Sequence, residues 1–108
     1  MGWSVEILNS TVLAELDALP CDIRAKLDHI VGLIEELGIE RVREPYVKHL
    51  RGQLWEMRMK GHSGLGRAIY VTQTGRRIVI LHAFRKHTSK TPKTAIRTAL
   101  SRVKELEP

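Results

Sequence analysis

The sequence predicts an α+β fold that contains an N-terminal strand, a helical hairpin, a three-stranded antiparallel meander and a C-terminal helix. Two patterns indicate this class. Apolar residues recur at helical spacing over residues 13–37 and 95–103, and they follow strand periodicity over residues 3–8 and 54–84. The chain has 108 residues, of which 43% are hydrophobic and 28% are charged. This length and composition fit one globular domain that spans residues 1–108.

The first part of the chain supplies the strand and the helical hairpin. Residues 3–8 alternate as in a strand, and residues 9–11 offer side chains that can cap a short helix, which Pro20 ends. Asp22 is expected to cap a second helix, and Gly38 is expected to end it. The apolar face of this second helix is formed by Ile23, Leu27, Ile30, Val31, Ile34 and Leu37.

The meander is expected to follow a connection at residues 39–53, where Pro45 and Gly52 stand among mixed charges. Its strands are predicted at residues 54–59, 67–72 and 77–84, with a glycine-rich loop at 61–66 and a turn at 73–75. The last strand is the most apolar and is expected to be central.

Alternation sorts the first meander strand into two faces. One face carries Leu54, Glu56 and Arg58, and the other carries Trp55, Met57 and Met59. Because Trp55 shares a face with two methionines, we expect it to pack under the helical hairpin. After the last strand, Thr91 is expected to cap the final helix, with Pro92 at its first position.

Charge is distributed unevenly along the chain. The net charge is +6, but residues 1–57 hold ten acidic and six basic residues. Residues 58–104 hold twelve Lys or Arg and three His, with no Asp or Glu. Clustered basic residues create a steering field, so this half predicts a polyanion partner, most simply a nucleic acid. The alternative is a solvated basic surface that serves solubility.

Several classes of protein are excluded or disfavoured by composition. The single cysteine, Cys21, excludes an internal disulfide framework and a cysteine-based zinc site. No His-x-x-x-His pair or carboxylate cluster indicates a metal, so no cofactor is expected. The N-terminal residues lack the features of a signal peptide, and no apolar run reaches membrane-span length. A cytoplasmic location without membrane contact is therefore the default expectation.

Several short segments of the sequence resemble those of a known family. Leu54-Trp55-Glu56-Met57-Arg58 and Arg67-Ala68-Ile69-Tyr70 are followed by an apolar strand, the loop Lys86-His87-Thr88-Ser89-Lys90-Thr91-Pro92 and a helix. These segments and their order resemble the RelE/ParE superfamily of type II toxins, in particular its phage-derived, HigB-like branch. His87 departs from the branch pattern, which prefers a second lysine at this position.

The resemblance implies a RelE-like fold and a small cytoplasmic toxin. Most members are RNases that cut mRNA, many of them on the ribosome, and a cognate antitoxin, often a helix-turn-helix repressor, holds them inactive. The ParE subgroup instead inhibits DNA gyrase by protein contact. Three hypotheses follow: an mRNA-cleaving endoribonuclease, a gyrase inhibitor, and a nucleic-acid-binding module without catalysis.

RNA cleavage without a metal requires two proton carriers and cations that stabilise the phosphate. Arg58 and Arg67 on neighbouring strands are candidates for gripping phosphate oxygens, and Lys86 precedes a helix N-terminus that favours an anion. His87 and Tyr70 are the candidate proton carriers, with Glu56 either a base or the ion-pair partner of Arg58. Tyr70 is equally compatible with packing.

Further basic residues are candidates for tracking the RNA backbone. These RNA-binding candidates are Lys60, Arg76, Arg77, Arg85, Lys90 and Lys93, and the helix residues Arg97, Arg102 and Lys104 extend the same rim. His82 follows Leu81 in an apolar strand and is expected to be a satisfied core histidine. His49 and His62 are expected in loops.

Overall fold

The protein is built on one five-stranded mixed sheet, seen in a computed structural model that describes residues 2–88 and 90–106. The strands stand in the order β1-β5-β4-β3-β2, with β1 parallel to β5 and every other pair antiparallel. The strands are β1 (Ser4–Ile7), β2 (Val47–Arg51), β3 (Leu54–Gly61), β4 (Gly64–Gln73) and β5 (Arg77–Lys86). The predicted meander is therefore present, and its two longest strands, β4 and β5, both lie in the interior of the sheet.

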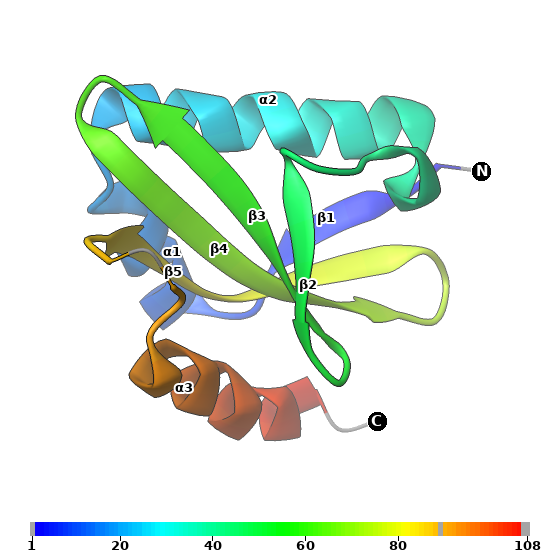
Figure 1. The fold of residues 1–108 in the computed structure, drawn as a ribbon. Coiled ribbons are helices and arrows are strands. Elements are labelled where there is room, and N and C mark those ends of the chain that lie inside the picture. Colours follow the sequence, from blue (N-terminus) through cyan, green and yellow to red (C-terminus); the bar gives the residue numbers. More distant parts are fainter. Residues whose placement is uncertain (1, 89, 107–108) are drawn as a thin grey trace.

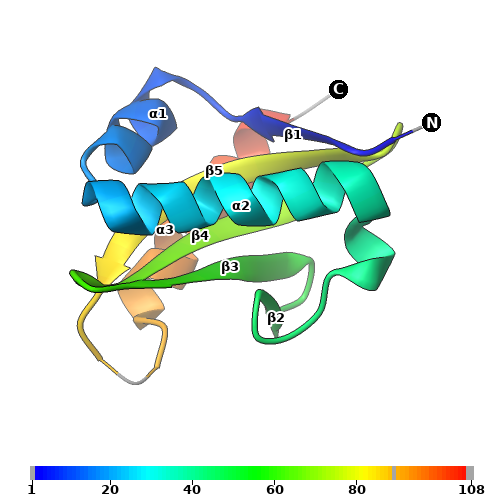
Figure 2. The same cartoon turned by 90° about the horizontal axis from the view of Figure 1, so that it is seen from above.

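Helices cover both faces of the sheet, as the two views in Figures 1 and 2 show. One face packs against α1 (Ser10–Asp17) and α2 (Cys21–Leu37), and the short 3-10 helix η1 (Ile39–Arg41) follows α2. The other face packs against α3 (Lys93–Val103) and the 3-10 helix η2 (Lys104–Leu106). The mixed α+β class and the placement of the helical hairpin are confirmed.

Two apolar cores result, one on each side of the sheet. The core under α1 and α2 contains Leu16, Ile23, Ile30, Ile34, Met57, Met59 and Tyr70, all 2% exposed or less. The core under α3 contains Leu54, Ile69, Val71, Val79, Leu81, Ala95 and Ala99. Because the middle strands are covered on both faces, their sequences are almost continuously apolar, which is why β5 was predicted to be central.

The predicted connection at residues 39–53 is wrong in its second half, because residues 47–51 form β2. This strand pairs antiparallel with β3, and Lys48 lies opposite Glu56. It also puts His49 on a strand rather than in a loop. An edge strand of five residues with one buried and one half-buried side chain lacks a clear period-2 pattern, so the sequence did not reveal it.

Trp55 does not pack under the helical hairpin as expected. Its side chain is 38% exposed, and its ring centroid lies 5.0 Å from that of His49 on β2. The predicted alternation of β3 is nevertheless confirmed, since Met57 and Met59 belong to the core under α2 and Leu54 to the core under α3. The hairpin covers only the second half of this strand.

The predicted glycine-rich loop between β3 and β4 is instead a tight hairpin with His62 and Ser63 at its tip. The Asp22 carboxylate accepts a hydrogen bond of 2.7 Å from the backbone N–H of Ser63, and this bond lowers the pKa of Asp22. Asp22 therefore ties α2 to the hairpin instead of capping the helix, whose N-cap is Pro20. The cap predicted for the first helix is confirmed, because the Asn9 side chain accepts from the backbone N–H of Val12 at the start of α1.

An ion network fixes α3 to the opposite helical layer. Arg102 on α3 donates to both carboxylate oxygens of Glu15 on α1, each at 2.9 Å, and also to the carbonyl of Leu81. His82 lies 2.9 Å from the same carboxylate, so it is a satisfied, mostly buried histidine as expected. Arg102 is thus a structural residue and does not belong to a free basic rim.

None of the described helices is long and apolar enough to cross a lipid bilayer.

Replacing Gly66 by alanine is expected to lower the free energy of unfolding. A Cβ at this position would lie 2.6 Å from Cγ2 of Ile23, in the fully packed core between β4 and α2. Overpacking of this kind costs about 1–3 kcal/mol. The matched control is Gly32→Ala on α2, where a Cβ meets nothing within 4 Å and helix propensity predicts a gain of about 0.5–1 kcal/mol. Urea unfolding of both variants measures the contrast, and equal stability of the two would contradict the packing described.

Stability is expected to fall in acid partly through Glu15. Burial alone would raise its pKa, but hydrogen bonds from Arg102, His82 and the backbone of Ala83 hold that pKa below its ordinary value. A carboxylate with a lowered folded-state pKa stabilises the fold above its unfolded-state pKa of about 4.3 and loses that contribution as the pH falls further. Unfolding free energies measured from about pH 6 down to about pH 2 should decline less steeply for Glu15→Gln than for the wild type, with the difference arising below about pH 4.3.

Candidate active site

Three charged side chains are buried in the described part of the chain, and all three lie in one cluster. Glu56 on β3 is 2% exposed, Arg67 on β4 is 3% exposed and Lys86 at the end of β5 is 7% exposed. Arg58 lies directly opposite Arg67 in the β3–β4 register and is half-buried. Burying a charged side chain is costly unless the charge is paired, so these residues must compensate one another within the sheet.

Glu56 is the centre of the cluster. Its Oε2 atom lies 3.5 Å from Nε of Arg67 and 3.8 Å from Nε of Arg58. Its Oε1 atom accepts a hydrogen bond of 2.7 Å from the hydroxyl of Thr91. One carboxylate therefore positions both strand arginines and the end of the basic loop.

The role of Thr91 differs from the predicted one. Thr91 does not cap α3, because the N-cap is Pro92 and no side-chain cap bond forms there. Thr91 stands one residue before the cap position, and its hydroxyl donates to the buried Glu56 carboxylate. Thr91 instead fastens the loop of residues 87–92 to the sheet.

Arg67 is held firmly from two sides. Its Nη1 atom donates to the carbonyl of Gly66 at 2.8 Å, and its buried Nε atom faces Glu56 without the geometry of a hydrogen bond. Burial lowers the pKa of Arg67, although the charge of Glu56 partly offsets this. A guanidinium has five N–H donors, so these contacts leave donors for a ligand in the cleft that Arg67 lines.

Lys86 ends β5 beside these arginines. Burial lowers its pKa, the nearby positive charge of Arg67 lowers it further, and Glu56 opposes the shift. Arg58 and Lys48 also lower the pKa of Lys86. A lysine in such surroundings gives up its proton more readily than an exposed one, which is the property that proton transfer near neutral pH requires.

A cleft of about 420 Å³ opens next to the two arginines. It lies between α2, the segment before β2 and the β3–β4 hairpin. The described residues that line it are Lys26, His29, Ile30, Pro45, Tyr46, Arg58, Met59, Lys60, Leu65 and Arg67. The predicted RNA-binding residue Lys60 is therefore in the neighbourhood of the cluster.

Tyr70 is not brought to the cluster. Arg67 and Tyr70 are three residues apart on one strand, so their side chains point to opposite faces. Tyr70 is 1% exposed in the core under α2, and its hydroxyl has no hydrogen-bond partner. Burial raises its pKa well above the ordinary value.

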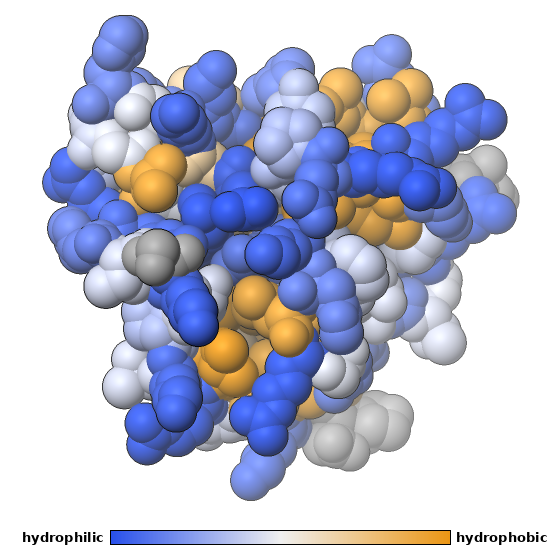
Figure 3. Space-filling view, viewed as in Figure 1, coloured by the Kyte–Doolittle hydropathy of each residue, from blue (hydrophilic) through white to orange (hydrophobic). Residues whose placement is uncertain are grey.

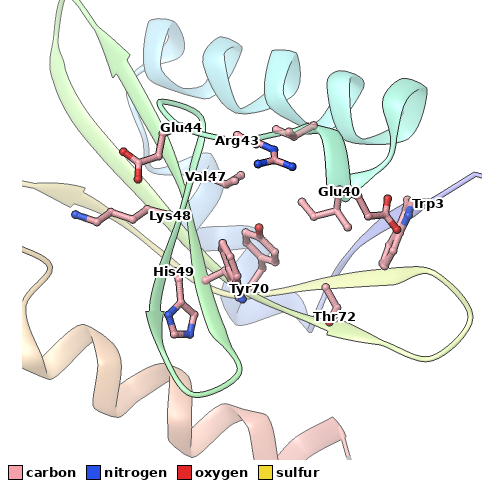
Figure 4. A pocket seen from close by; sticks show the side chains of 12 residues that line it. Trp3, Glu40, Arg43, Glu44, Val47, Lys48, His49, Tyr70 and Thr72 are labelled. Carbon is pink, nitrogen blue, oxygen red and sulfur yellow. The ribbon is translucent and has the colours of Figure 1, made fainter.

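The Tyr70 ring lines a second, larger cavity of about 640 Å³, shown in Figure 4. Trp3, Val47 and Trp55 contribute apolar walls, and Glu40 and Arg43 contribute charge. On the surface in Figure 3, hydrophobic residues gather at the right, between the end of α2 and the β4–β5 hairpin, and again below the middle next to α3, with a hydrophilic band between them. This cavity is thus distinct in chemistry from the cationic cluster.

The loop after β5 carries the remaining predicted site residues. His87 and Lys90 are both exposed, and the hydroxyl of Thr88 donates to the carbonyl of Lys90 at 2.7 Å. Lys93 is exposed in the first turn of α3. Ser89 lies outside the described residues.

The predicted RNA-binding arginines are spread over the molecule. Arg76 and Arg77 lie at the β4–β5 turn, on the right of Figure 1, whereas Lys86 and the basic loop lie at the other end of β5. Arg77 makes a bidentate ion pair with Glu6, at 2.7 and 2.9 Å. Arg85 donates to the carbonyl of Ser63 in the β3–β4 hairpin. The structure does not bring Arg76 and Arg77 to the cluster.

Sequence reasoning missed two contributors to this region. The charge of Lys48 on β2 lowers the pKa of Lys86. Tyr46, which immediately precedes β2, lines the cleft. Both were hidden because residues 39–53 were read as a connection. Among the described residues, no three or more His, Cys, Asp or Glu side chains converge to hold a metal ion.

The chain belongs to the phage-derived Gp49-like protein family, whose model matches residues 14–104. It is 34% identical, over 90 residues, to the probable endoribonuclease HigB1 of Mycobacterium tuberculosis, a match found in two strains. The match covers 83% of this chain and 69% of that protein. The family resemblance predicted from residues 54–103 is confirmed.

A solved structure shares the fold. The crystal structure of an archaeal RelE–RelB complex from Pyrococcus horikoshii contains a chain that superposes with a TM-score of 0.59 at 23% identity. The match covers 82% of this chain and all of that one. The predicted RelE-like architecture is therefore confirmed.

Replacing Glu56 by glutamine is expected to destabilise the protein and to change the titration of Lys86. Removing one partner of a buried ion pair leaves uncompensated charge and costs about 3–5 kcal/mol. Glu56 raises the pKa of Lys86 against the surrounding cations, so its loss should lower that pKa further. Urea unfolding and NMR titration of the lysine side chains measure both effects. An unchanged Lys86 titration in a folded Glu56→Gln variant would contradict the electrostatic coupling.

Proposed function

We propose that this protein is the toxin of a toxin–antitoxin system and acts as an endoribonuclease that cleaves mRNA in the cytoplasm. The observation that carries the proposal is the buried Glu56 carboxylate with Arg58, Arg67 and Lys86 gathered around it. Such a concentration of cations on a concave surface suits a phosphate whose negative charge grows during cleavage. The similarity to a probable endoribonuclease supports the same reading.

The reaction would be an internal transesterification. The ribose 2′-oxygen attacks the adjacent phosphorus and loses its proton, while the bond from phosphorus to the 5′-oxygen breaks and that oxygen gains a proton. Arg58 and Arg67 would stabilise the pentacovalent phosphate, with Glu56 fixing their orientation. No metal is needed for either half of this step.

Lys86 and His87 are the candidates for moving the two protons. The lowered pKa of Lys86 favours it as the group that accepts the 2′-hydroxyl proton. His87 follows it in the chain and is exposed, and its imidazole is a side chain that can donate a proton to the leaving oxygen. Tyr70 has no part in this scheme because it is buried on the other face of the sheet.

We further propose that a cognate antitoxin, of helix-turn-helix type as in relatives of this branch, neutralises the protein. The structural neighbour is a chain of an archaeal RelE–RelB complex. An acidic segment of the antitoxin over Arg58 and the loop of residues 87–92 would match their charge and block access to RNA. Cleavage at the ribosome is part of the same proposal, since a cationic face can also dock ribosomal RNA.

Induced expression in a bacterial host, combined with mapping of RNA 5′ ends, tests the proposed function. We expect growth arrest with new 5′ ends inside translated messages. Arrest with intact messages would instead indicate a protein target such as gyrase. Soluble wild-type protein that causes no arrest would overturn the toxin proposal.

Lys86→Met is expected to lower kcat for RNA cleavage about 100-fold while the fold persists, because a charge-stabilising and proton-carrying group is lost. The control is Arg77→Gln, which removes a charge at the other end of β5 and should leave kcat within about threefold. Single-turnover cleavage of a fluorescent RNA gives both values. A Lys86→Met enzyme with wild-type kcat would remove Lys86 from the mechanism.

A further inference from the structure

The cleft beside Arg58 and Arg67 has a composition suited to a nucleotide. Four cations line it, namely Lys26, Lys60, Arg58 and Arg67, and no Asp or Glu occurs among the described residues of its wall. The first half of the chain is rich in acidic residues, yet among the described lining residues it contributes Lys26 and no Asp or Glu to the cleft. A cavity with this field favours an anionic ligand.

The same cleft holds an aromatic pair from two different elements. His29 on α2 and Tyr46 before β2 meet edge to face, with ring centroids 5.9 Å apart and ring planes at 65°. Tyr46 is 38% exposed and lines the cleft, so part of this side chain is accessible to a ligand. Bases of single-stranded RNA are commonly held by stacking on such exposed aromatic side chains.

The cleft adjoins the charged cluster around Glu56. Arg58 and Arg67 line it and also pair with Glu56. The backbone N–H of Arg58 donates to the carbonyl of Tyr46 at 2.8 Å, which joins the aromatic side of the cleft directly to the cationic side. A phosphate held by Arg58 therefore has an aromatic-lined space of about 420 Å³ at its side.

We propose that this cleft is a base-binding subsite for the RNA substrate. The base of a nucleotide next to the scissile phosphate stacks on Tyr46, with His29 supporting the ring from its edge. Lys26 and Lys60 contact the neighbouring phosphates. The inference rests on the proposed ribonuclease function and adds to it the residues that hold the substrate base.

The experiment measures binding separately from cleavage. Short single-stranded RNA with 2′-O-methyl riboses cannot be cut by 2′-hydroxyl attack, so its affinity is measured by fluorescence anisotropy with the full chain. Tyr46→Leu is expected to weaken binding about tenfold, because stacking of one base is lost. Tyr46→Phe, which keeps the ring, should bind within about twofold of the wild type.

Trp55→Leu is the matched control. Trp55 is also 38% exposed, but it lies on the other cavity, so its loss should leave RNA affinity unchanged. Equal affinity of Tyr46→Leu and wild type would overturn the subsite while leaving the cleavage assay untouched. Wild-type protein that neither binds nor cuts RNA would instead overturn the proposed function.

A second measurement does not depend on the folding of a variant. RNA that carries 4-thiouridine is crosslinked to the wild-type protein with light, and the attached peptides are identified by mass spectrometry. Crosslinks to the peptide containing Tyr46 or His29 support the subsite. Crosslinks confined to peptides of α3 would overturn the subsite.

Discussion

The site depends on one buried carboxylate. Glu56 stands in a face of the sheet where Arg58, Arg67, Lys86 and Lys48 would otherwise repel one another, and it also accepts the hydroxyl of Thr91. A lone buried carboxylate would be costly, and so would the buried arginine, but together each offsets much of the desolvation of the other. The cations are thereby held close without a ligand, which is the preorganisation that phosphate chemistry uses.

The rest of the fold keeps this arrangement in place. The arginines sit opposite each other on the β3–β4 hairpin, whose tip is held to α2 by Asp22 and whose close packing requires Gly66. The helix α3, which follows the basic loop, is anchored at its far end through Arg102 to Glu15. Both faces of the sheet are thus braced around the cluster, whose residues Glu56, Arg58, Arg67 and Lys86 all come from strands.

The sequence predicted the features that depend on hydrophobic periodicity and on the distribution of charge. It did not predict the features that depend on which strands pair in the fold. Alternation in β3 correctly put Glu56 and Arg58 on one face, and Arg67 and Lys86 from the acid-free half lie in the same buried cluster. By the same alternation rule, the side chains of Arg67 and Tyr70 point to opposite faces of the sheet, although the two residues belong to one sequence motif. The strand β2 carries no period of its own, because its existence depends on the partner edge of β3. Because β2 was not predicted, neither the contribution of Lys48 nor the position of Tyr46 could be predicted.

The central claim is that Glu56 and Arg67 act as one energetic unit. A double-mutant cycle on the free energy of unfolding, with Glu56→Gln, Arg67→Met and the combined variant, tests it most directly. The account predicts that the double variant is more stable than the sum of the single losses implies, by at least about 1 kcal/mol, since each single change strands a buried charge that the other removes. Additivity within about 0.5 kcal/mol would contradict it and would show two independent surface-like charges.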